Sequence, residues 1–160
     1  MRTIEYNRST AVEYAKKWAF ERNPGYYDFD GIGGDCTNFA SQCLYAGSGV
    51  MNYTRDVGWY YISANDRAAA WSGAQYFHNF ITANSGVGPV AVNSDISNLQ
   101  LGDFIQLHNG TEFYHTLIIT GFSGSEPLIA AHTRDAYMTP LSLYTYAEPF
   151  GLHITGVHVW

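Results

Sequence analysis

The stretch Gly31-Ile32-Gly33-Gly34-Asp35-Cys36-Thr37-Asn38-Phe39-Ala40-Ser41-Gln42-Cys43-Leu44 places three glycines just before a cysteine that opens an amphipathic segment. The apolar residues that follow Cys36 recur with the spacing of one helix face. Cys36 therefore lies in the first turn of a predicted helix, where free backbone N–H groups and the positive end of the helix dipole stabilise a thiolate. The stretch predicts a nucleophilic cysteine, with glycines that let a substrate backbone approach closely.

The composition is that of a globular protein with few charges. A chain of 160 residues is long enough to bury one core without disulfides, so we expect a single domain over residues 1–160, present as a monomer. Charged residues make up 14% of the chain and aromatic residues 16%, including 13 tyrosines, which suits a surface that touches other molecules. The net charge of −6 argues against a nucleic-acid partner, because phosphate binding needs clustered Lys and Arg.

The two cysteines, Cys36 and Cys43, are not expected to form a disulfide. Seven residues of helix separate them by about 10 Å along the axis, which is too far for a disulfide. Free thiols fit the cytosol or an exported protein that uses a thiol. The first 20 residues hold charges rather than an apolar signal core, and no run reaches transmembrane length. If the protein is exported, we expect its leader or anchor to lie outside this sequence.

The first half of the chain is predicted to be helical. A helix is expected over residues 6–22, capped by Asn7 or Thr10, and the Cys36 helix is expected to end near Gly47. Another helix is expected over residues 65–83, capped by Asn65 or Asp66. Between them, residues 50–62 form an aromatic loop that either joins the core or walls a groove.

The second half of the chain is predicted to be strands. After Pro89, strands are expected at residues 104–107, 114–120, 128–132, 141–144 and 152–160, with turns at Asn109-Gly110 and Ser123-Gly124-Ser125. Helices followed by a mostly antiparallel sheet predict an α+β fold.

Three residues match the needs of thiol catalysis. Attack of a thiol on an amide requires a thiolate, a base that later protonates the leaving nitrogen, a group that orients the base, and oxyanion donors. His115 begins a predicted strand, where its imidazole can face the helix packed on the sheet. His132 ends the neighbouring strand, where it can hydrogen-bond the far ring nitrogen of His115. The backbone N–H of Cys36 provides one oxyanion donor.

Four segments resemble a family of bacterial enzymes. The segments are Gly33 to Gln42, Leu101-Gly102-Asp103-Phe104-Ile105, Tyr114-His115-Thr116-Leu117-Ile118 and Ile129-Ala130-Ala131-His132. They are similar to the papain-like cell-wall hydrolases of the NlpC type, and most similar to an amidase domain family within that group. This resemblance extends from about Tyr6 to the C-terminus and includes Arg22-Asn23-Pro24, Tyr26-Tyr27 and His132-Thr133-Arg134-Asp135.

The resemblance implies a fold, a reaction and a place of action. It implies a papain-like fold, with the nucleophile helix packed on the sheet, and hydrolysis of an amide bond in peptidoglycan through an acyl-enzyme intermediate. It implies no metal and no other cofactor, and a substrate that is a wall peptide or glycopeptide. We therefore expect a secreted or cell-wall-associated bacterial protein, or a phage lysin module.

Residue by residue, the resemblance also implies catalytic roles. Cys36 matches the nucleophile, His115 the base and His132 the third position, which orients the imidazole. Asp135 is the alternative third residue, because a carboxylate is the better partner for an imidazolium.

Four further residues are candidates for contact with the substrate. Asp35 matches an acidic residue that meets a substrate amine. Tyr26 or Tyr27 matches an upstream tyrosine near the oxyanion. Trp59, in the aromatic loop, is the fourth candidate.

Several alternatives remain open at this point. Cys36, His115 and His132 are residue types that bind zinc, although no closely spaced ligand pair anchors such a site. A cysteine deamidase, transamidase or isopeptidase acting on proteins would use the same residues, and a silent wall-binding module would keep the fold without turnover. Within peptidoglycan, an amidase and a stem or cross-bridge endopeptidase would cut similar amides. Cys43, His78, His108, His153 and His158 are expected to be structural.

Overall fold

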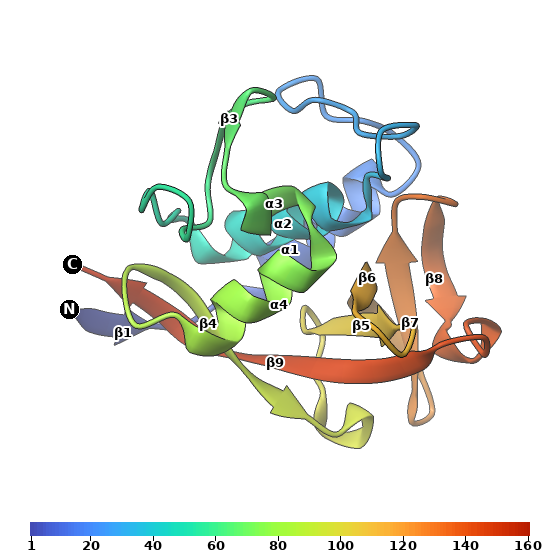
Figure 1. The fold of residues 1–160 in the computed structure, drawn as a ribbon. Coiled ribbons are helices and arrows are strands. Elements are labelled where there is room, and N and C mark those ends of the chain that lie inside the picture. Colours follow the sequence, from blue (N-terminus) through green and yellow to red (C-terminus); the bar gives the residue numbers. More distant parts are fainter.

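The computed structural model describes residues 1–160 as an antiparallel sheet with its helices gathered on one face (Figure 1). The helices are α1 (Arg8–Trp18), α2 (Cys36–Ser48), α3 (Ala69–Ser72) and α4 (Ala74–Ala83), with 3-10 turns η1 (Ile96–Asn98) and η2 (Leu141–Leu143). The main sheet comprises β1 (Arg2–Ile4), β4 (Gly88–Ser94), β5 (Phe104–His108), β6 (Phe113–Ser123), β7 (Glu126–Ala131), β8 (Ala136–Pro140) and β9 (Glu148–Val159). A separate pair is formed by β2 (Tyr61–Ser63) and β3 (Asp66–Arg67).

The long strand β9 organises the main sheet. The strand order is β1-β9-β5-β6-β7-β8, with β4 also paired to β9, and every pairing is antiparallel. The expected hairpin turns are present, since β5 and β6 flank Asn109-Gly110 and β6 and β7 flank Gly124. The predicted α+β class with an antiparallel sheet is therefore confirmed.

The predicted helix after the glycines is also confirmed. Its apolar face is buried in the larger of two cores, between the sheet and the helices; this face consists of Phe39, Ala40, Cys43 and Leu44. The helix ends at Gly49, whose φ of 74° is left-handed and costs glycine no Cβ clash. In α1, Asn7 is the cap, because its side chain accepts a hydrogen bond from the Thr10 N–H. No helix of the fold is long and apolar enough to cross a bilayer.

The sheet buries side chains on both faces, and this decides where the residues of β6 point. Ile118 belongs to the larger core under the helices, whereas Leu117 and Ile119 belong to a second, smaller core on the opposite face. Thr116, two residues before Ile118, points toward the helices, where its hydroxyl lies 2.9 Å from that of Thr37 in α2.

A buried carboxylate joins α1 to the sheet. Asp103 is fully buried and accepts hydrogen bonds from the Arg8 guanidinium at 2.7 Å, the Ile154 N–H at 2.9 Å and the Gln100 N–H at 2.8 Å. The ring nitrogen Nδ1 of His153 lies 2.8 Å from the same carboxylate. Leu101-Gly102-Asp103 is thus a structural junction between chain segments far apart in sequence.

Two predicted elements are wrong. The helix expected over residues 65–83 begins only at Ala69 and is split at Gly73, while Asp66-Arg67 pair with β2 instead of capping a helix. The strand expected over residues 141–144 is the short turn η2. In addition, β1, β4 and β8 were not predicted, because each is short or sits beside turn residues and shows little alternation.

Candidate active site

Cys36 is the first residue of α2 and lies against the backbone of β6. It is 8% exposed, and its Sγ lies 3.9 Å from the carbonyl oxygen of Tyr114 and 3.7 Å from Thr37 Oγ1. Burial raises the pKa of the Cys36 thiol above its usual value and outweighs the hydrogen bonds from the Thr116 N–H and Thr37, which lower it. The thiolate expected at the helix start is therefore not favoured in the free protein. A base must remove the proton.

Hydrogen bonds hold the start of α2 in place against the sheet. The hydroxyls of Thr37 and Thr116 are 2.9 Å apart, and Gln106 Nε2 lies 3.1 Å from Thr116 Oγ1. The same Gln106 amide donates to the Ala74 carbonyl at 2.9 Å, at the start of α4. These contacts fix the nucleophile helix relative to β5, β6 and α4.

His115 is a buried imidazole with no hydrogen bond to the rest of the chain. It is 8% exposed, and burial lowers its pKa from 6.5 to about 4. The ring is therefore neutral near pH 7 and has a nitrogen free to accept a proton. Its residue lies between Tyr114 and Thr116, whose backbone groups contact the Cys36 sulfur. The rings of Tyr114 and Tyr144 stand 6.4 and 6.1 Å from the imidazole, centre to centre.

His132 does not make the hydrogen bond to His115 that the sequence predicted. Its Nδ1 lies 2.6 Å from Asp35 Oδ2, its Nε2 lies 2.8 Å from the Trp18 carbonyl, and its ring stacks on Phe39 at 3.9 Å. The reason lies in the register of β6 and β7. Ile118 pairs with Ala130, so continuing the ladder puts His132 opposite Thr116, on the helix side of the sheet. His132 therefore faces Thr116 rather than His115.

Asp135, the alternative orienting residue, is also bound elsewhere. Its two carboxylate oxygens accept hydrogen bonds from the Arg22 guanidinium at 2.9 and 3.0 Å, a bidentate pair. Arg22 also pairs with Asp30, and its Nε lies 3.4 Å from Asp28. Burial alone would lower the pKa of Arg22, but the hydrogen bonds to Asp135 and Asp30 outweigh it and raise the pKa.

His132 and Asp135 both lie in one strained turn that closes the β7–β8 hairpin. Thr133 and Arg134 both have φ near 60°, a left-handed conformation that is costly for a β-branched residue. Thr133 Oγ1 accepts a hydrogen bond from the Asp35 N–H at 3.0 Å. We call the turn residues 132–135, with their partners Asp35 and Arg22, the clamp. The clamp holds the loop that leads into Cys36.

Two of the four candidate substrate contacts, Asp35 and Trp59, are buried. Asp35 is 1% exposed, and its Oδ1 accepts hydrogen bonds from the Phe29 N–H and the Asn38 amide, so its carboxylate is not available to a substrate amine. Trp59 is fully buried and donates from Nε1 to Ser41 Oγ at 3.0 Å. The burial of Trp59 places that part of the aromatic loop in the core rather than in a groove wall.

The two tyrosines predicted near the oxyanion differ in exposure. Tyr26 is packed against Trp71 and Tyr61, with ring centres 5.9 and 5.0 Å away. Tyr27 is 45% exposed, and its N–H donates to the hydroxyl of Tyr61 at 2.8 Å. Of the pair, Tyr27 has the side chain that is open to a ligand.

Two residues near the site, Arg22 and Tyr144, were assigned no role from the sequence. Arg22 lies in the Arg22-Asn23-Pro24 motif, so its position was visible, but its four acidic neighbours were not, because the fold of the loop and of the β7–β8 turn brings them to it. Tyr144 falls where a strand was predicted, and only the turn η2 brings it near His115.

The geometry does not assemble the zinc ligands considered above. Both ring nitrogens of His132 are engaged with Asp35 and Trp18. No group of three or more His, Cys, Asp or Glu side chains is arranged to hold a metal ion.

Comparison with known proteins assigns the chain to a family. The family model described as "Putative amidase domain" matches residues 5–155. In Bacillus subtilis (strain 168), the uncharacterized protein YhbB is 34% identical over 143 residues, covering 86% of this chain and 44% of the relative. The uncharacterized protein YjcM of the same organism is 29% identical over 161 residues, covering 95% of this chain and 37% of the relative.

The chain thus spans less than half the length of these two relatives. No solved structure matches it. Because the family model covers nearly the whole chain, this protein belongs to the amidase domain family, which points to amide hydrolysis.

Proposed function

We propose that this protein is a cysteine-dependent hydrolase that cuts an amide bond in bacterial peptidoglycan, on a papain-like fold, with Cys36 as nucleophile and His115 as base. The observation that carries the proposal is the position of the Cys36 sulfur, which lies at the start of α2 against the backbone on both sides of His115. Membership of the amidase domain family supports the reaction class.

The charge states of the two groups suit a mechanism that begins with proton transfer. Cys36 is protonated at rest, because burial raises its pKa, and His115 is neutral, because burial lowers its pKa to about 4. His115 takes the thiol proton as the sulfur attacks the carbonyl carbon. The resulting imidazolium then gives this proton to the leaving nitrogen, and the C–N bond breaks to leave a thioester on Cys36. Water, deprotonated by His115, hydrolyses the thioester and restores the thiol.

The oxyanion formed in each addition step needs donors. The backbone N–H of Cys36 is one of the first N–H groups of α2, which have no partner within the helix. The exposed Tyr27 is the second candidate, because it lies on the loop leading to the nucleophile. The clamp keeps this loop in place while charge develops on the substrate.

The proposed substrate is a wall peptide or glycopeptide, and the proposed place of action is outside the cytoplasm, at the cell wall. A surface with few charges and many tyrosines suits an amphipathic polymer of sugars and short peptides. Tyr114 and Tyr144, whose rings are the aromatic neighbours of the His115 ring, are the residues that we propose to contact the substrate beside the base.

The central test compares the two cysteines. Cys36→Ala should reduce release of soluble fragments from purified cell walls by at least about a thousandfold, since it removes the nucleophile. Cys43→Ala, in the same helix but buried in the core, should keep the activity and lose about 1 kcal/mol of stability. Mass spectrometry of the fragments identifies the bond that is cut. Undiminished lysis by folded Cys36→Ala would refute the proposal.

A further inference from the structure

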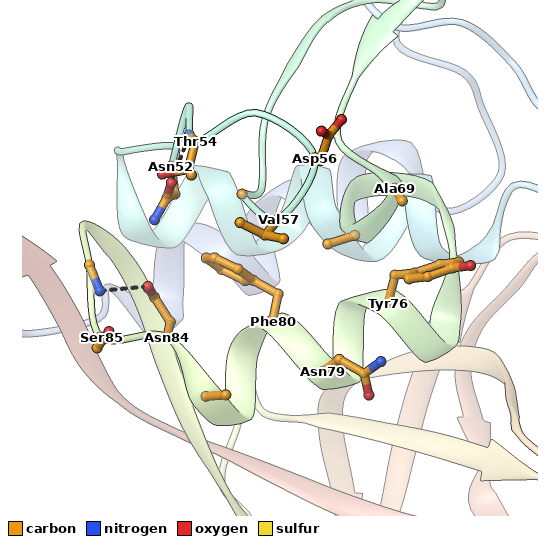
Figure 2. Close-up of a pocket in the computed structure, with 14 residues that line it drawn as sticks. Asn52, Thr54, Asp56, Val57, Ala69, Tyr76, Asn79, Phe80, Asn84 and Ser85 are labelled. Carbon is orange, nitrogen blue, oxygen red and sulfur yellow. Dashed lines mark hydrogen bonds between the residues drawn. The ribbon is translucent and has the colours of Figure 1, made fainter.

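A groove separate from Cys36 and His115 lies between the 52–58 turn and helices α3 and α4 (Figure 2). Its volume is about 630 Å³, within the range of ligand sites in proteins. Figure 2 shows Val57 above the ring of Phe80, with Asn52 at one end of the groove and Tyr76 at the other. No residue of the clamp contributes to it.

The 52–58 turn forms the lip of the groove, and backbone hydrogen bonds hold it in place. An antiparallel bridge joins Asn52 to Trp59 through two backbone hydrogen bonds of 2.9 and 2.8 Å. Between them the chain turns tightly at Asp56, whose φ is 68°, and at Gly58, where a Cβ would collide with the carbonyl oxygens of Asn52 and Thr54. The groove is therefore formed before any ligand arrives.

The lining combines an apolar floor with unpaired polar groups. Phe80 and alanines of α3 and α4 supply the floor, and Val57 faces Phe80 from the lip. Asn52 and Asn79 each use the side-chain oxygen within the chain, Asn52 for the Thr54 N–H and Asn79 for Gln75, and each leaves its NH₂ group without a partner. The Tyr76 hydroxyl also has no partner in the chain, and its side chain is exposed.

The chemistry of the lining selects among ligand classes. The lining holds no Lys or Arg, which argues against an anionic ligand. The backbone of α4 and of the 54–58 turn is hydrogen-bonded internally, so an extended peptide finds no strand edge to join. An uncharged ring with one apolar face, and with hydroxyl and acetamido groups at its edge, fits both the floor and the free amides. We propose that this groove binds N-acetylated sugar units of the wall glycan.

The groove is connected to the proposed catalytic helix. Ala69 and Ala70 of α3 line it, and α3 is bonded to the first turns of α2, where Ser41 Oγ donates to the Trp71 carbonyl at 2.8 Å and Trp71 Nε1 donates to Asn38 at 2.9 Å. A glycan held in the groove would lie against α3, which these bonds fasten to α2, the helix that begins at Cys36. The biological use of this site rests on the proposed function, because glycan strands accompany the peptides of the wall.

The test uses a glycan without peptide, so that it does not depend on catalysis. Chitotetraose, the tetramer of N-acetylglucosamine, is titrated into the Cys36→Ala protein and followed by amide NMR shifts. We expect binding with a Kd on the order of 1 mM, shifts at the groove residues, and about tenfold weaker binding in Tyr76→Ala and in Asn79→Ala. Tyr53→Ala is the matched control, because Tyr53 is an exposed tyrosine of the 52–58 turn that does not line the groove, and this variant should bind normally.

The outcomes separate this inference from the proposed function. Absence of binding at 10 times the expected Kd, or binding that Tyr76→Ala and Asn79→Ala leave unchanged, would overturn the glycan site even if Cys36 hydrolyses wall amides. Binding that both variants weaken would support the site even if no amide is cut.

Discussion

At the scale of single residues, burial decides the chemistry of His115. An exposed histidine gains its proton near pH 6.5, whereas this imidazole gains it near pH 4, because the surrounding protein disfavours the charged form. A neutral imidazole accepts a proton from a thiol, and a protonated one does not. The lowered pKa therefore keeps His115 in its neutral, proton-accepting form well below pH 7.

The acid side of the pH profile tests this property. We expect kcat/KM for a soluble wall peptide to stay level from pH 7 to about pH 5 and to fall only toward pH 4, as His115 takes up a proton. His115→Asn should lower kcat/KM by roughly 10²- to 10⁴-fold, because it removes the base. A fall centred near pH 6.5 would mean that the base is a solvated histidine instead.

The same shift affects stability, with a sign that can be derived. Between pH 6.5 and about 4 the unfolded chain binds a proton on this histidine and the folded chain does not. The unfolded state then binds more protons, so stability falls as the pH drops through this range. In urea titrations, His115→Gln should lose this part of the pH dependence and keep the rest. An unchanged slope would show that His115 is protonated in the folded state too.

At the scale of elements, the clamp assigns His132 and Asp135 to the nucleophile loop rather than to the base. The β7–β8 turn bonds to Asp35 through the His132 ring and the Thr133 hydroxyl, and to Arg22 through Asp135. Asp35 directly precedes Cys36, so the turn acts on the nucleophile through the loop that carries it. A strained turn that is kept for such contacts fits a functional role.

Two substitutions distinguish the contributions of His132 and Asp135 to the clamp. His132→Ala leaves the 1% exposed carboxylate of Asp35 without its closest partner and should cost about 3–5 kcal/mol of stability, measured by urea unfolding. The freed negative charge beside the sulfur raises the pKa of Cys36 further, so alkylation by iodoacetamide at pH 7 should slow several-fold. Asp135→Asn, on a partly exposed pair, should cost about 1 kcal/mol or less.

If His132→Ala is as stable as the parent and is alkylated at the same rate, but has lost turnover, then His132 acts on His115, as the sequence predicted, and not on Asp35.

The elements show why sequence patterns succeeded in some places and failed in others. The helix that begins at Cys36 was predicted because its apolar face, its first turn and the glycine that ends it all lie within one short stretch of sequence. The prediction of one helix over residues 65–83 was wrong because Trp71 and Ile81 keep a helical spacing on either side of Gly73. The apolar pattern therefore does not reveal the break between α3 and α4.

For the site, the sequence located Cys36 in the first turn of its helix and His115 on a strand beside it. It did not fix the partners of His132 and Asp35. Those depend on strand register and on which face each residue takes, and a shift of one residue reverses the face. The burial of Trp59 was left open for a related reason, since an aromatic residue in a loop can equally well be core.

At the scale of the whole molecule, Asp103 connects distant parts of the chain. It joins α1 through Arg8 and the last strand through Ile154, so one carboxylate holds together residues close to both ends. Asp103→Asn removes the charge that Arg8 requires and should destabilise the protein by about 3 kcal/mol in urea. Alkylation of Cys36 in the folded variant should be unchanged, because these contacts lie outside the clamp. Slower alkylation would show that the junction also positions the nucleophile.

The deep burial of Cys43 also determines how the protein responds to oxidants. When peroxide converts a reactive thiol to a sulfenic acid, a second thiol nearby can condense with it and protect it from further oxidation. Cys43 is fully buried and faces the core, and Cys36 is the only other cysteine. A sulfenic acid on Cys36 therefore has no partner within the chain. Its recovery depends on small thiols from the surroundings, and without them oxidation proceeds to the irreversible sulfinic acid.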